Sequence, residues 1–249
     1  MMGGLAKGLA VIECFTADRP RQSISEIAQA SGLDRATARR CLLTLAHQGY
    51  AYWDGKYFTL TPRVLRLGTA CLATLPLPRI VQPFLDRISD QIGESSSVSV
   101  LDGAEIVYIA RAAQKKVMSI SLMPGSRLPA FCTSMGRVLL AALPETDAQA
   151  ILQSAAPLPA RTNRTMTDLS AIMQELARVR ANGYALIDQE VETGLCSIAV
   201  PIRNAYGKVV AAMNVGMAAS PDFARHAVED LLPALQQTQT ELRGLIGQL

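Results

Sequence analysis

The chain has 249 residues, a formal net charge of +3 and 49% hydrophobic residues. That length suits one large domain or two smaller ones, and the composition can build a hydrophobic core. No apolar stretch reaches the roughly 18 residues of a membrane-spanning helix, so we expect a soluble, cytoplasmic protein. Five scattered cysteines without a C-x-x-C pair, and only two histidines, argue against a zinc site or a disulfide framework. We expect neither a metal nor a cofactor.

Positive charge is concentrated in the first quarter of the chain. Residues 1–66 carry nine basic and five acidic side chains, so the remainder is close to neutral. A basic segment on a neutral body is typical of a protein that binds a polyanion at one end.

Three helices are predicted before residue 50. The spacing of Leu5, Leu9, Ile12 and Phe15 predicts an amphipathic helix over residues 5–17. Ser23 and Glu26 are spaced as in a capping box, which starts a second helix that Gly32 breaks. The third helix is expected from the cap Asp34 to about Gln48, with Gly49 as its C-terminal stop.

The third helix presents arginines away from its apolar side. At about 100° per residue, Ala38 and Leu42 face one way, while Arg39 and Arg40 face the other. The hairpin signal Asp54-Gly55 follows directly, as in a wing behind a helix-turn-helix reading helix. Exposed arginines often serve only solvation, but together these features predict a winged helix-turn-helix that binds double-stranded DNA. The expected DNA contacts are Arg39 and Arg40 for bases or nearby phosphates, Arg35, Thr37 and Lys56 for phosphates, and also Ser23 and Ala36.

The rest of the chain is expected to form a linker helix and an α+β domain. We place the DNA-binding domain at residues 1–61, the linker helix at 62–76 and the second domain at 77–249. The linker helix has an apolar stripe comprising Val64, Leu65, Leu67, Ala70, Cys71 and Leu75. The second domain is predicted to hold antiparallel strands, one of them over VMSISLM (117–123), with helices to one side and a closing helix over about 221–246.

Polar residues in this second domain predict a binding pocket. Thr133, Ser134 and Gly136 surround a helix start whose free N–H groups suit a carboxylate, although such caps also start ordinary helices. Asp188, Ser197 and Asn214 stand in or beside apolar strands, where each needs either a ligand or an internal partner. Nothing places His47 or His226 near a nucleophile, and no nucleotide-binding motif is present. We therefore expect binding and not catalysis.

The chain resembles IclR-family transcriptional regulators over nearly its whole length. The segments SISEIAQASGLDRATARRCLLTLAHQGY, PGSRLPAFCTSMGRVLLAALP and GLCSIAVPI with AAMNVGM carry the resemblance. It implies a GAF-like antiparallel-sheet effector-binding domain, a homodimer or homotetramer and a palindromic DNA site. The segment RLPAFCTSMGRVLLA most resembles the corresponding segment of the family branch that controls protocatechuate and 4-hydroxybenzoate breakdown through the β-ketoadipate pathway.

The resemblance also implies an effector site. The family's effector pockets map onto Ser134, Met135, Asp188, Ser197, Asn214 and Gly216. Leu122, Arg127, Thr133 and Gly136 complete the expected effector site. Ser134-Met135 replaces a frequent Gly-Ala, and Gly216 a frequent serine, which favours an aromatic or dicarboxylic acid over a small keto acid. Arg127 either holds a second carboxylate or braces its loop, and we favour bracing. The alternatives are a regulator of another carbon-source pathway, sensing a keto or sugar acid, and a small-molecule enzyme with a basic module.

Overall fold

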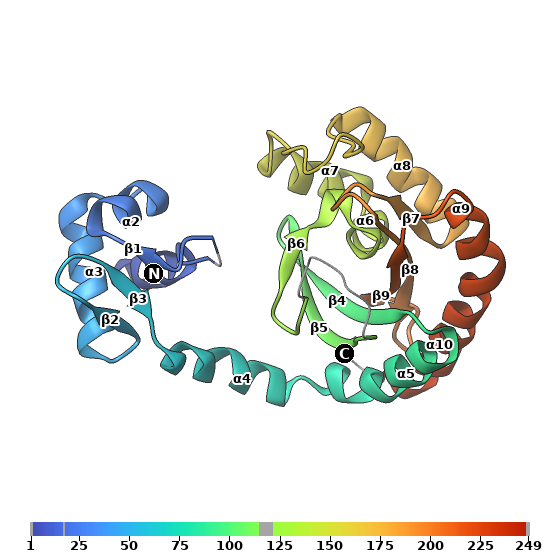
Figure 1. Cartoon of the computed structure of the whole chain (residues 1–249), viewed down its shortest axis with the longest axis horizontal. Helices are drawn as coiled ribbons and strands as arrows, with labels where there is room; N and C mark the ends of the chain where they lie inside the picture. The colour runs from blue at the N-terminus through green and yellow to red at the C-terminus, as the bar shows by residue number, and fades with distance from the viewer. Residues whose placement is uncertain (1, 17, 115–121, 248–249) are drawn as a thin grey trace. The chain divides into compact units, whose positions relative to one another are not determined.

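Separate hydrophobic cores divide the chain into two units. The computed structural model describes residues 2–16, 18–114 and 122–247 (Figure 1). Unit 1 is Met1–Thr74 and unit 2 is Leu75–Leu249.

Unit 1 is a small helical unit closed by a short sheet. Its helices are α1 (Gly3–Glu13), α2 (Ile24–Ser31) and α3 (Arg35–His47). The strands β1 (Arg21–Gln22), β2 (Ala51–Trp53) and β3 (Phe58–Leu60) pair antiparallel in the order β1-β3-β2. The core comprises Val11, Ile27, Ala38, Leu42, Ala51 and Phe58.

Local sequence signals fix the ends of α2 and α3. The capping box at Ser23 and Glu26 is present, and Gly32 ends α2 in the left-handed region at φ +67°. Asp34 caps α3 by accepting a hydrogen bond from the Thr37 backbone N–H at 2.8 Å.

The first helix is shorter than predicted. It ends at Glu13 and not at residue 17, and the Gln22 side chain donates a hydrogen bond to the Cys14 carbonyl at 2.6 Å. That bond satisfies a carbonyl at the helix end, which a longer helix would use internally. Leu5 and Leu9, predicted to face the core, are exposed, and Val11 is buried in their place.

The linker region contains two helical segments before the second unit. A 3₁₀ turn, η1 (Pro62–Val64), leads into α4 (Leu65–Thr74), whose Leu65 and Leu67 are exposed. The side chain of Cys71 lies outside the described part. The next helix, α5 (Pro76–Ile92), begins at a proline, which is well tolerated in the first helical turn.

Unit 2 is built on a six-stranded antiparallel sheet of the described strands. Their order is β6-β5-β4-β9-β8-β7. The strands are β4 (Ser95–Asp102), β5 (Glu105–Ala112), β6 (Arg127–Pro129), β7 (Ala185–Asp188), β8 (Leu195–Arg203) and β9 (Val209–Ala218). Residues 117–121 of the predicted strand VMSISLM lie outside the described residues. The short strand β6 was expected to be loop.

Helices cover both faces of this sheet, whereas the sequence predicted helices on one side only. The helices α5 and α10 (Leu232–Leu245) pack on one face (Figure 1). On the other face lies α6 (Ser134–Ala141), with α8 (Leu169–Asn182) packed against it. Strands β4, β8 and β9 have consecutive buried residues, so both faces of the sheet are covered. The remaining segments are η2 (Ala130–Cys132), α7 (Glu145–Ser154), α9 (Phe223–His226) and a π-helical turn at Ala227–Leu231.

Candidate functional site

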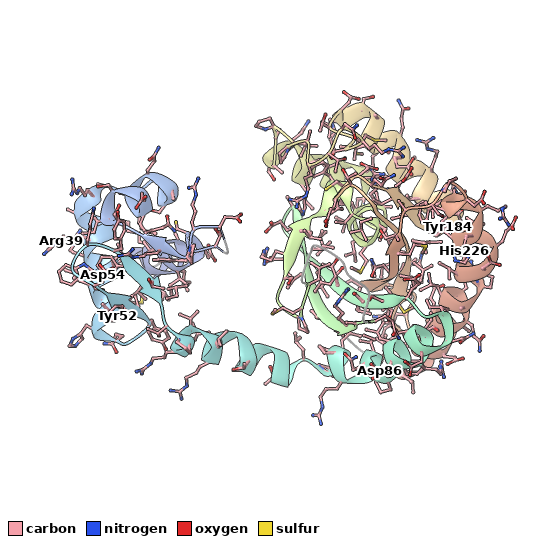
Figure 2. All side chains as sticks on the ribbon, in the orientation of Figure 1. Arg39, Tyr52, Asp54, Asp86, Tyr184 and His226 are labelled. Carbon is pink, nitrogen blue, oxygen red and sulfur yellow. The ribbon has the colours of Figure 1, made fainter. Side chains whose placement is uncertain are left out.

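The arginines of α3 form an exposed, unpaired basic surface. Arg35, Arg39 and Arg40 are exposed, and Figure 2 shows Arg39 at the outer surface of unit 1. Among the described residues, no carboxylate lies within ion-pair distance of these guanidinium groups. Their charges are therefore available to the phosphates and base edges of a duplex.

Thr37 does not present its side chain as predicted. The residue is 6% exposed, and its hydroxyl accepts a hydrogen bond from Arg40 Nη2 at 3.1 Å. This hydroxyl is therefore engaged with Arg40, and the phosphate contact of Thr37 stays a prediction. Thr37 lowers the pKa of Asp34, chiefly through its side chain and also through its backbone N–H, and this keeps the cap charged.

The wing is a tight turn held by one carboxylate. Asp54 Oδ1 accepts the backbone N–H groups of Lys56 and Tyr57 at 2.9 and 2.8 Å, and the other oxygen pairs with Arg21. Arg21 also stacks over the Tyr57 ring, 4.3 Å from its centroid. Lys56 is thus exposed on an ordered tip. Ser23 takes part in the capping box and Ala36 is exposed; their contacts to DNA, like that of Lys56, stay predictions.

A small cavity of about 30 Å³ lies in unit 2 between the sheet and the start of α6. Strand register explains why polar groups gather there. Ser97 pairs with Arg111 on one side and with Asn214 on the other, and Gly216 lies between Ser95 and Ser197. The Ser197 hydroxyl meets that of Ser134 at 2.8 Å, which joins the sheet to α6.

A β-bulge turns Arg111 toward the cavity. The register of β4 and β5 shifts between Val98 and Ser99, so Tyr108 and Arg111 face the same side although they are three residues apart. Ile109 and Ala110 pack into the opposite core. Bulges often re-aim a side chain in this way near functional sites.

The cavity contains a buried donor and a buried acceptor without partners. Arg111 Nη1 donates to Ser97 Oγ at 2.9 Å, but Arg111 Nε and Asn214 Oδ1 are buried and lack a hydrogen-bond partner among the described groups. Burial lowers the pKa of Arg111 and raises that of Tyr108 to about 12. Unpaired buried polar atoms are rare and costly, which indicates a ligand as their partner.

Seven of the predicted effector residues line this cavity. They are Leu122, Thr133, Ser134, Met135, Ser197, Asn214 and Gly216. The residues that sequence reasoning missed are Ser95, Tyr108, Arg111, Leu128, Val191 and Leu195. Ser95 could have been found, because it opens a run of serines in an otherwise apolar strand. Arg111 could not, because alternation along β5 without the bulge puts it on the opposite face.

Three predicted effector residues lie elsewhere. Arg127 is on the outer strand β6, where it pairs with Asp102 at 2.8 Å and Glu105 at 2.7 Å. Asp188 pairs with Arg164 and accepts a hydrogen bond from the Cys196 thiol at 3.2 Å. Gly136 is buried against the backbone of Ala130. None of the three lines this cavity, so their contacts to an effector stay predictions; the ion pairs of Arg127 agree with the favoured alternative, in which this residue braces its loop.

The described residues contain no cluster of three or more metal-ligating side chains. Within the same part of the chain, no helix combines the length and the apolarity needed to cross a bilayer.

Comparison with known proteins identifies both units. The IclR helix-turn-helix domain matches residues 4–55, and the bacterial transcriptional regulator IclR C-terminal domain matches residues 69–242. The Pca regulon regulatory protein of Pseudomonas putida is 47% identical over 215 residues, covering 86% of this chain and 74% of that protein. The p-hydroxybenzoate hydroxylase transcriptional activator of Acinetobacter baylyi is 37% identical over 250 residues, covering 98% and 92%.

A solved structure extends this similarity to the fold. An IclR homolog from Microbacterium hydrocarbonoxydans, complexed with 4-hydroxybenzoate, superimposes with a TM-score of 0.73 at 27% identity and covers 97% of this chain and 98% of that one. The family and the α+β fold class predicted from the sequence are confirmed. The chain belongs to the IclR family of bacterial transcriptional regulators.

Proposed function

We propose that this protein controls genes for the breakdown of aromatic acids, binding promoter DNA through α3 and the wing and an aromatic or dicarboxylic acid in the unit 2 cavity. The observation that carries the proposal is the pair of buried atoms without a partner that this cavity contains, the donor Arg111 Nε and the acceptor Asn214 Oδ1. The names of the two relatives above, one for the Pca regulon and one for p-hydroxybenzoate hydroxylase, support this class of pathway.

The cavity chemistry suits an acid that carries an apolar body. A guanidinium can donate two parallel hydrogen bonds to a carboxylate, and Arg111 still has its Nε donor unused. Asn214 Oδ1 can accept from a hydroxyl of the same ligand. Apolar side chains surround these groups and suit a ring, namely Leu122, Leu128, Met135, Val191 and Leu195.

The size of the cavity implies that the effector selects a second conformation. A volume of about 30 Å³ is far below the several hundred Å³ typical of ligand pockets. An acid that enters must therefore bind a form of unit 2 with a wider cavity and raise its population. That shift gives the effector a physical means to change DNA binding.

A second copy of the chain is the expected partner. Leu5 and Leu9 of α1 border a groove of about 660 Å³ against α3, and Leu65 and Leu67 of α4 are also exposed. Apolar side chains gathered in this way indicate an interface with another protein surface. A homodimer would cover them and place two reading helices on a palindromic site.

Calorimetry on matched arginine variants tests the effector site. Arg111→Gln should weaken the binding of 4-hydroxybenzoate, protocatechuate or a dicarboxylic acid, whichever binds the wild type, by about tenfold to a hundredfold, since hydrogen bonds to charged groups contribute about 1.5–3 kcal/mol. Arg127→Gln is the control, because Arg127 is paired at the surface outside the cavity. Equal effects of the two substitutions, or no effect of either, would contradict the site.

A second arm of this experiment separates the two activities. Arg39→Ala combined with Arg40→Ala should abolish sequence-specific DNA binding in band shifts and leave acid affinity unchanged. If the acid affinity fell together with the DNA affinity, the assignment of DNA binding to unit 1 and acid binding to unit 2 would be wrong.

A further inference from the structure

A buried ion pair lies one helical turn beyond the cavity. Arg137 of α6 is 2% exposed, and its Nη2 lies 2.7 Å from Glu190 Oε2. Arg137 Nε donates to the Phe131 carbonyl at 2.9 Å, and Glu190 Oε2 also accepts the Met166 N–H at 2.9 Å. Neither side chain lines the effector cavity. The pair therefore has no direct part in the site described above.

The pair connects two segments that line that cavity. Ser134 and Met135, on the same helix as Arg137, form one wall, while Val191 and Leu195, which follow Glu190, form another. The position of the 189–195 segment thus decides how far Val191 and Leu195 reach toward the ligand.

Side chains of a neighbouring loop hold the same segment by its backbone. Thr162 Oγ1 donates to the Gln189 carbonyl at 2.7 Å, Thr165 Oγ1 to the Glu190 carbonyl at 2.7 Å, and Arg161 Nε to the Val191 carbonyl at 3.1 Å. The loop thus fixes three consecutive carbonyls, while Arg137 and the Met166 N–H fix the Glu190 side chain. These hydrogen bonds hold the 189–195 segment more firmly than is usual for a surface loop.

Gln189 adds a strained backbone at the start of this wall. Its φ is +60°, in the left-handed region that residues other than glycine rarely adopt. Its side chain supports that conformation, donating to Asp188 and accepting the Gly194 N–H at 3.0 Å. Strained backbone persists only where surrounding contacts over-determine it, and such positions cluster at binding sites.

We infer that Arg137 and Glu190 are positioning residues of the effector cavity: their buried ion pair sets the distance between α6 and the 189–195 wall and thereby selects among acids of similar size. A buried ion pair gives little net stability compared with well-packed apolar residues, but it demands one geometry. The inference rests on the proposed function, because it assumes that an acid binds in this cavity.

A double variant separates positioning from stability. Arg137→Met combined with Glu190→Leu removes both charges together and leaves no lone buried charge, so the double variant should melt closer to the wild-type temperature than either single variant. The affinity ratio between 4-hydroxybenzoate and 3-hydroxybenzoate should nevertheless fall at least fivefold toward unity, measured by calorimetry on the full chain. Arg87→Gln, which removes an ion pair with Glu241 between α5 and α10, is the control and should keep the wild-type ratio.

Hydrogen exchange provides a readout that needs no ligand. In the double variant, and in Glu190→Gln if the double variant does not fold, the amides of residues 189–195 should exchange at least tenfold faster than in the wild type. Unchanged exchange, or a stable double variant with the wild-type ratio, would overturn the positioning role. Faster exchange in a protein whose wild type binds neither acid would point instead to a failure of the proposed function.

Discussion

Gly136 and Gly216 show that two residues predicted for one site have different surroundings. A Cβ at Gly136 would lie 2.2 Å from the Ala130 carbonyl oxygen and 2.5 Å from Thr133 Oγ1, closer than real Cβ atoms approach. A Cβ at Gly216 would meet only Leu195 Cδ1, at 4.0 Å. The first position requires glycine for packing, whereas the second leaves open space at the cavity.

Alanine at the two positions should therefore give opposite results. Gly216→Ala should keep the wild-type melting temperature within a few degrees but weaken 4-hydroxybenzoate binding about tenfold or more, because one extra carbon in a pocket changes affinity by about 1–3 kcal/mol. Gly136→Ala should lower the melting temperature by several degrees, since overpacking typically costs about 1–3 kcal/mol. Thermal unfolding by circular dichroism and calorimetry measure the two effects. A stable Gly136→Ala variant that binds acid normally would contradict the packing role.

Single residues also mark the limit of prediction from the sequence. Ser197 and Asn214 could be placed in the pocket because polar side chains in apolar strands need a partner. Arg111 could not be predicted, because the direction of its side chain depends on a β-bulge that no turn residue signals. The partners of Arg127 could not be read from the sequence, because Asp102 and Glu105 come close to it only when β6 pairs with β5.

At the scale of elements, the wing depends on one carboxylate. Asp54 has a pKa lowered from 3.8 to about 2, chiefly because its charged form accepts backbone hydrogen bonds from Tyr57 and Lys56 and pairs with Arg21. Since the folded pKa lies below the unfolded one, the stabilisation is fully present above the ordinary value and is lost as pH falls through about 2. Trp53, the one tryptophan in the sequence, stacks on Phe58 in the same hairpin and reports on it.

Substitutions at Asp54 should separate the turn from the charge. Asp54→Asn keeps an acceptor for both N–H groups, so Trp53 emission at pH 7 should match the wild type. Asp54→Ala removes the acceptor, and we expect red-shifted emission together with a severalfold loss of DNA affinity in fluorescence anisotropy. Wild-type emission should stay constant from pH 8 to pH 5. A transition centred within that range would show that Asp54 is not the group that holds the wing.

Elements with strong local signals could be predicted, and those set by tertiary packing could not. The caps Ser23 and Asp34 fixed the starts of α2 and α3, because capping is a local interaction. The end of α1 and the placement of helices on both faces of the sheet depend on contacts between distant segments. Apolar strands can be buried on one face or on both, and periodicity alone does not distinguish these cases.

At the scale of the whole molecule, the two proposed sites lie in separate units. The reading helix and the wing belong to unit 1, and the effector cavity belongs to unit 2, with α4 at the end of unit 1. Each unit has its own core. Regulation therefore requires that the acid and the DNA each prefer one of two states of the whole protein, because binding with equal affinity to both states shifts nothing.

Linkage makes this coupling measurable from either site. If an acid changes the DNA affinity by some factor, DNA must change the acid affinity by the same factor, and coupling of about 1–3 kcal/mol corresponds to roughly 5- to 150-fold. We expect the acid affinity, measured by calorimetry with and without a saturating duplex selected by the wild type, to differ by a factor in this range. The change in DNA affinity with and without acid, measured by anisotropy, should equal it.

The variant combining Arg39→Ala and Arg40→Ala provides the control for this comparison. Its acid affinity should not respond to the duplex, because the DNA no longer binds specifically. Equal acid affinities of the wild type with and without DNA would mean that the units act independently. Two unequal factors would break the thermodynamic cycle and indicate that the acid acts at a second site or on the oligomeric state, since a one-site two-state protein must satisfy the equality.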